Sequence, residues 1–197
     1  MRRSNHFTHD LLVADPPADI ILIQEPWHGR IGVRRSDSDP AGTNTLGGVS
    51  SPVWNFIYPG IADLGNTKAK VMAYTRKSNP SFTVANRLDL VSHPSLLILE
   101  VFAGDNHFFI TNVYHDVHDP TCRHTLFSLE LNPLVPALYI GDFNTHSPTW
   151  SPPFSTRSPW SHDLESWAAL NLLDLLNTPG VPTRFGEGNH IRKNPQR

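Results

Sequence analysis

The feature that most constrains the fold is a short apolar run, residues 137–141, that leads directly into Gly-Asp-Phe-Asn at 141–144. The run predicts a strand, and side chains two residues apart in extended backbone point to the same side. Asp142 and Asn144 can therefore face one site. An aspartate can act as a base or a metal ligand, and an asparagine can orient a water or an oxyanion without adding charge. The segment predicts a polar site at a strand end.

Two further predicted strands also end in polar residues. Residues 20–23 are four consecutive apolar residues, which predicts a strand buried on both faces. This strand delivers Glu25 at its C-terminal end, where Pro26 stops it. Residues 107–114 predict another strand that ends in Tyr114. Because loops at one edge of a layered fold gather strand ends, the three polar ends are expected to meet.

Apolar periodicity and turn residues predict the remaining elements. Thr8 and Ser161 are the expected N-caps of two helices. Residues 104–106 (GDN) are the expected turn of a hairpin, and residues 28–50 are expected to be a loop. Further strands are predicted at 53–58, 69–75, 82–85, 96–102 and 172–176, and helices at 8–14, 120–131 and 161–170.

Strand pairs separated by helices predict an α/β sandwich of two packed, mostly antiparallel sheets flanked by helices. No repeat or linker divides the chain, so residues 1–197 are expected to form a single domain.

Four segments in this order resemble the endonuclease/exonuclease/phosphatase superfamily: 19–27 (DIILIQEPW), 110–116 (ITNVYHD), 139–150 (YIGDFNTHSPTW) and 180–185 (GVPTRF). The third segment is similar to the Gly-Asp-Phe-Asn-Ala-His-x-x-Trp signature of the endonuclease domain of non-long-terminal-repeat (LINE-type) retrotransposons. The resemblance runs from about Asp10 to Phe185. It implies a DNase I-like fold and a metal-dependent phosphodiesterase that nicks DNA.

The resemblance also implies roles for single residues. Glu25 would bind a divalent metal, Mg²⁺ or Mn²⁺. Tyr114 would contact the scissile phosphate, and Asp142 would help to activate the attacking water. Asn144 would orient groups around the phosphate.

Two later residues match the family less directly. Thr183 would lie close to the phosphate, and His146 matches a histidine typical of the group, in a supporting position. By resemblance the partner is DNA, a longer parent protein would carry a reverse transcriptase domain, and the place of action would be the nucleus.

Two family segments are missing from this sequence. They are a first strand with an Asn-x-Asn-like segment, and a final Ile-Asp-Leu strand with a Ser-Asp-His segment, for which His190 is no substitute. The domain is therefore expected to be truncated at both ends. We expect weak or no nuclease activity, because losing a proton-transfer or charge-stabilising group costs about 10²–10⁴-fold in rate.

Composition narrows the class of protein further. No stretch of about 18 or more apolar residues is present, and the N-terminus lacks a signal-peptide core, so an intracellular protein without a membrane span is expected. The single Cys122 excludes an internal disulfide framework and is expected to pack as a small hydrophobe. The net charge of −2 gives no support for DNA binding, although a metal ion can offset phosphate charge.

The candidate residues also have purely structural interpretations. Glu25 could be a polar strand end, and Tyr114 a half-buried aromatic with a wet hydroxyl. Asp142 could accept a hydrogen bond within an Asx turn, and Thr183 could be a turn residue. The alternative functions are a phosphatase of a small phosphoester on the same fold, and a non-catalytic relic.

Histidines 115, 118 and 124 suggest a zinc cluster at first sight. They lack cysteine partners and an established zinc spacing, so scattered surface histidines are the preferred interpretation.

Overall fold

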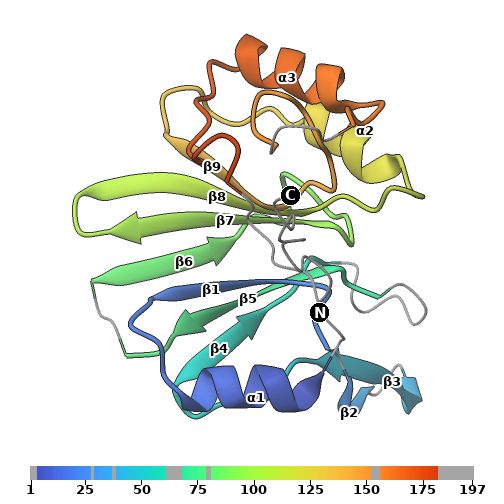
Figure 1. Cartoon of the computed structure of the whole chain (residues 1–197). Helices are drawn as coiled ribbons and strands as arrows, with labels where there is room; N and C mark the ends of the chain where they lie inside the picture. The colour runs from blue at the N-terminus through green and yellow to red at the C-terminus, as the bar shows by residue number, and fades with distance from the viewer. Residues whose placement is uncertain are drawn as a thin grey trace, which may run out of the picture. The chain divides into compact units, whose positions relative to one another are not determined.

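The computed structural model describes residues 4–27, 29–36, 39–60, 68–78, 81–151 and 156–181. The chain forms two compact units, Met1–Asn144 and Thr145–Arg197 (Figure 1). Within the described residues, the second unit contains one helix, α3 (Ser161–Leu170). The first unit contains the following elements: α1 (Asn5–Val13), β1 (Ile20–Gln24), β2 (Gly29–Ser36), β3 (Asp39–Gly47), β4 (Trp54–Ile57), β5 (Val71–Arg76), β6 (Phe82–Asn86), β7 (Leu96–Ala103), β8 (Asn106–Tyr114), α2 (Thr121–Phe127) and β9 (Ala137–Asp142).

The strands of the first unit form two larger sheets and a hairpin. One sheet has the order β1-β5-β4, the other has the order β6-β7-β8-β9, and β2 pairs with β3. The pairs are antiparallel except β8 with β9, which is parallel. Parallel neighbours need a crossover connection, and α2 lies in that connection. The predicted architecture of two mostly antiparallel sheets with helices is confirmed.

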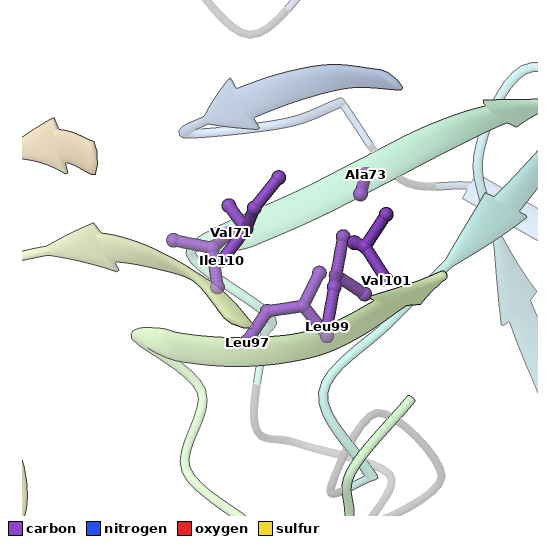
Figure 2. Packing of buried hydrophobic residues seen from close by; sticks show 6 residues of the cluster. All are labelled: Val71, Ala73, Leu97, Leu99, Val101 and Ile110. Atoms are coloured by element: carbon purple, nitrogen blue, oxygen red, sulfur yellow. The ribbon is translucent and has the colours of Figure 1, made fainter. Parts of the chain in front are cut away.

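The two larger sheets pack face to face through an apolar core (Figure 2). Val71 to Thr75 of β5 are all buried. Because side chains alternate along a strand, both faces of β5 are therefore covered. One face contributes to the layer between the sheets, made of Val71, Ala73, Leu97, Leu99, Val101 and Ile110.

The other face of β5 packs against α1. Met72 and Tyr74 form a second cluster with Leu12 of the helix and Trp54 of β4. In Figure 1, α1 accordingly lies on the side of the three-stranded sheet that faces away from β6–β9. The predicted strand at 20–23 contributes to both clusters, with alternate residues on each side. Its continuous apolar run is explained by this two-sided packing.

The cap predicted for the first helix was wrong. Ser4 is the N-cap, and its side-chain oxygen accepts a hydrogen bond from the Phe7 amide at 3.3 Å. Thr8 lies inside α1, is buried, and donates its hydroxyl to the Ser4 carbonyl at 3.2 Å. The cap prediction for Ser161 was also wrong, because Trp160 occupies that position in α3.

The loop predicted at 28–50 is largely the β2–β3 hairpin. Its sequence carries turn residues rather than an alternating apolar pattern, so the pattern gave no signal for strands.

The strand predicted at 172–176 does not form. Leu172 has a positive φ of 54° and is 91% exposed. An apolar run is insufficient to make a strand, and none of the described strands pairs with this one. Helix α2 is also shorter than predicted, ending at Phe127.

Cys122 is buried in α2, as predicted. Burial raises the pKa of its thiol to about 12, so the thiol stays protonated and packs as an apolar group. Among the helices that the structure describes, none combines the length and the apolar character needed to cross a membrane.

Candidate active site

The parallel pairing of β8 and β9 places two predicted site residues side by side. Tyr114, at the end of β8, is the register partner of Asp142, at the end of β9. The His115 amide also donates to the Asp142 carbonyl at 2.9 Å. Two strand ends that are distant in sequence therefore present a phenol and a carboxylate from adjacent backbone positions.

Gly141 permits this close pairing. Its φ is 151°, and a Cβ built there would lie 1.9 Å from the Val113 carbonyl oxygen. Only a residue without a side chain can place its backbone so near the neighbouring strand. The glycine before Asp142 is thus a condition for the position of Asp142.

Tyr114 also reaches the end of β1 on the other sheet. Its hydroxyl donates to Glu25 Oε1 at 3.0 Å. The Glu25 amide donates to the Lys70 carbonyl at 2.8 Å, which ties the turn after β1 to the start of β5. Glu25, Tyr114 and Asp142 are therefore brought together from three strand ends, as the sequence predicted.

The hydroxyl of Tyr114 stays protonated and can act as a hydrogen-bond donor. Burial, then the hydrogen bond to Glu25, and then the charges of Glu25, Asp116 and Asp142 raise its pKa to about 12. All these effects disfavour the phenolate. Tyr114 accordingly keeps its proton at neutral pH.

Asp142 and Asn144 form the Asx turn that the sequence left open as an alternative. The Asn144 amide donates to Asp142 Oδ1 at 3.0 Å, and Asn144 Nδ2 donates to the His115 carbonyl at 2.8 Å. The turn engages one of the two carboxylate oxygens of Asp142. It anchors both side chains against the segment that follows Tyr114, so a structural role and a chemical role coexist in this geometry.

Two predicted site residues have a strained backbone. Glu25 has a φ of 49° and Asn144 a φ of 45°. In the described part of the chain, only Asp15 and Leu172 are other non-glycine residues with positive φ. Asparagine tolerates this region, whereas glutamate adopts it rarely. Such strain persists where surrounding contacts over-determine the backbone, as they often do at functional sites.

The strain at Glu25 gives a testable difference between two truncations. Glu25→Ala and Glu25→Gly both remove the carboxylate, but glycine accepts a positive φ without cost. We expect the glycine variant to be more stable than the alanine variant by roughly 1 kcal/mol. Urea unfolding followed by circular dichroism measures this difference, and an alanine variant at least as stable as the glycine variant would contradict it.

An ion pair that the sequence did not suggest lies beside the site. Lys70 Nζ bonds Asp116 Oδ2 at 2.6 Å, and the two side chains are 22% and 28% exposed. The Lys70 hydrogen bond, together with the His118 amide, lowers the pKa of Asp116. Burial is the main cause that lowers the pKa of the neighbouring His115, which favours the neutral imidazole.

The carboxylate oxygens of Glu25 are donors of the kind that a hard cation such as Mg²⁺ prefers. Among the residues that the structure describes, no group of three or more His, Cys, Asp or Glu side chains is arranged to hold a metal ion. Mg²⁺ is commonly held by one or two carboxylates, with waters and substrate phosphates completing its coordination. A carboxylate at Glu25 fits that pattern, whereas a closed, all-protein metal cage does not.

The contacts described above do not include the two remaining candidates, Thr183 and His146. Thr183 is outside the described residues. His146 belongs to the second unit, where its backbone exchanges two hydrogen bonds with Ser158, both at 2.8 Å, and its Nδ1 lies 3.4 Å from Ser151 Oγ. Within that unit His146 therefore helps to order a loop.

Glu165 of α3 organises the same loop. Its carboxylate accepts hydrogen bonds from Ser147 Oγ, from Thr149 Oγ1 at 2.8 Å and from Arg157 Nη1 at 2.9 Å. These hydrogen bonds, led by that of Ser147, lower the pKa of Glu165. Part of the motif-like sequence after Asn144 thus serves to hold the loop on α3.

The two packed, mostly antiparallel sheets with helices define the class of fold, a DNase I-like α/β sandwich. A search of solved structures found the chain similar to the "Endonuclease domain of TRAS1, a telomere-specific non-LTR retrotransposon". The TM-score is 0.59 and the identity 15%, over 93% of this chain and 71% of that chain. No protein-family model and no curated protein sequence matches the chain. The predicted fold class is therefore confirmed by structural similarity.

Proposed function

We propose that this chain is a metal-dependent phosphodiesterase that nicks DNA. One observation carries the proposal: the Tyr114 hydroxyl bonds Glu25 at 3.0 Å, while Tyr114 is the register partner of Asp142. Two carboxylates and a neutral hydrogen-bond donor thus come from three strand ends to one place, which supports the proposal.

The proposed chemistry assigns one task to each group. Asp142 takes a proton from the attacking water. Tyr114 keeps its single proton and would turn it from Glu25 to the phosphate oxygens, and Asn144 would donate a further hydrogen bond to the charge that develops there. Glu25 would hold Mg²⁺ or Mn²⁺, which when bound supplies charge stabilisation for the phosphate and the leaving oxygen. Thr183 is proposed to contact the same phosphate.

DNA is the proposed substrate because the similar solved structure is the endonuclease domain of a retrotransposon. The chain has a net charge of −2, so a bound cation would offset part of the repulsion from the phosphates. A longer parent protein with a reverse transcriptase domain, acting in the nucleus, completes the proposal.

A plasmid-nicking assay tests the proposal. Supercoiled plasmid is incubated with the protein and Mg²⁺, and conversion to open circles is followed on a gel with and without a chelator. We expect slow conversion that chelation abolishes. A variant without the Asp142 carboxylate, purified identically, controls for contaminating nucleases.

The other outcomes favour the competing functions. Equal conversion by the control variant would assign the activity to contamination and overturn the proposal. Phosphate release from a small phosphoester without nicking would favour a phosphatase on this fold. If the protein shows neither nicking nor phosphatase activity, the non-catalytic relic is the favoured interpretation.

A further inference from the structure

We infer that the buried Asn112 and the half-buried Gln24 form an amide clamp that positions Glu25 and Tyr114 against each other. Asn112 and Gln24 are then positioning residues of the proposed active site, so the functional part of the inference rests on the proposed nuclease activity. The clamp itself is a geometric device and is testable without that activity.

Asn112 joins the two sheets through three hydrogen bonds. Its side chain on β8 is fully buried, with 0% of its surface exposed. Its Nδ2 donates to the carbonyl of Ile23 at 3.2 Å and to that of Met72 at 3.0 Å. Its Oδ1 accepts from Gln24 Nε2 at 2.7 Å. Since Ile23 and Met72 are register partners, one side chain grips both β1 and β5 at the same level.

The clamp lies directly beside the candidate site on both sheets. Gln24 is the residue before Glu25, and Asn112 is two residues before Tyr114 on the same face of β8. The clamp and the bond between Tyr114 and Glu25 therefore join the same two strand ends. A shift of either strand would have to break both.

The identity of residue 112 is unexpected on packing grounds. Phe108, Ile110 and Tyr114 of the same strand all pack on the apolar layer between the sheets. The alternation therefore calls for an apolar side chain at position 112. Burying an amide costs about 1–3 kcal/mol for any polar group left unpaired, so its presence requires complete pairing.

Hydrogen bonds fix the position of one sheet on the other more narrowly than apolar packing does. Apolar contacts are non-directional, and an apolar interface tolerates small shifts of one sheet over another. Fully satisfied buried polar groups accept one arrangement, because any other leaves groups unpaired. At a site that must hold a carboxylate and a phenol at hydrogen-bond distance, such a device sets the geometry.

Three variants separate positioning from general stability. Asn112→Leu keeps a similar volume and removes all three hydrogen bonds of the Asn112 side chain. Gln24→Met removes the Nε2 donor that bonds Asn112 Oδ1. Val101→Ala is the matched control, because Val101 lies in the same apolar layer but pairs with Phe108, toward the other end of β8. All are compared well below their melting temperatures, where each is folded by circular dichroism.

The first readout does not depend on activity. We expect amide hydrogen exchange at Glu25 and Tyr114, measured by NMR, to accelerate about tenfold or more in Asn112→Leu through local opening. Val101→Ala should leave those two amides within about twofold of the wild type after correction for its global stability. Equal exchange at both amides in all variants would overturn the clamp.

The second readout is the kcat for nicking. We expect Asn112→Leu and Gln24→Met each to lower kcat by about 10–100-fold with an unchanged KM for plasmid, as outer-shell partners of site residues do. The double variant should lose little more than either single one, because both break the same contact. If Val101→Ala lowers kcat as much as Asn112→Leu does, the effect of Asn112 is ordinary core packing and the clamp is wrong.

The two readouts keep the inference separate from the proposed function. If the wild type does not nick, the proposed function fails, and the exchange data alone decide whether the clamp holds the strand ends. If the wild type nicks and the exchange data show no effect of Asn112→Leu, the proposed function stands and the clamp is wrong.

Discussion

Alanine in place of Gly141 should unfold the chain or lower its free energy of unfolding by about 4 kcal/mol or more, a loss reserved for a few mechanisms. The new Cβ would meet the Val113 carbonyl oxygen at 1.9 Å, within the backbone of the neighbouring strand. The φ of 151° adds strain, since side chains avoid this region. Relief would require β9 to move from β8, which would break the ladder that places Asp142 beside Tyr114.

Gly104→Ala is the matched control. Gly104 also has a positive φ, 57°, but a Cβ there would meet nothing within 4 Å. We expect a cost of roughly 1–2 kcal/mol from backbone strain alone. Urea unfolding of the two variants separates the mechanisms, and equal losses would show that the contact with Val113 contributes nothing.

Asparagine in place of Asp142 should lower the nicking rate by about 10²–10⁴-fold, the usual worth of a positioned general base. The substitution keeps the side-chain volume and an oxygen that can accept from the Asn144 amide, so the Asx turn can persist. The variant should therefore melt close to the wild-type temperature while losing its activity. Initial nicking rates and thermal unfolding of the same preparations measure both quantities.

This substitution distinguishes the two interpretations of Asp142. If the carboxylate only caps the turn, Asp142→Asn will nick at the wild-type rate, which would contradict the catalytic assignment. Asp105→Asn makes the same chemical change in the exposed hairpin turn between β7 and β8 and should leave the nicking rate unchanged. A loss in both variants would point to a general effect of the altered charge.

The strands that carry the site were predictable because their signals are local. The apolar run before Glu25 and the glycine before Asp142 are visible in the sequence, and the structure ends β1 and β9 at those points. The β2–β3 hairpin was missed because it lacks an alternating apolar pattern. The strand at 172–176 was wrongly predicted because an apolar run says nothing about whether a partner strand exists.

Some site contacts had no sequence signal at all. Asn112 reads as one polar residue in a strand, and its role depends on the carbonyls of Ile23 and Met72, which belong to two other strands. Lys70 and Asp116 are likewise distant in sequence, and only the fold pairs them. The roles of Thr183 and His146 remain predictions.

Local patterns were sufficient to determine which residues end strands and which chemical groups those ends carry, because burial alternation and Gly or Pro punctuation act over a few residues. They could not determine which ends meet. Tyr114 and Glu25 are separated by 89 residues, and their 3.0 Å hydrogen bond exists because two sheets pack face to face. Tyr114 and Asp142 are neighbours because β8 and β9 pair in parallel across a helical crossover. Packing and strand pairing are properties of the whole chain, so the site took shape only in the tertiary structure.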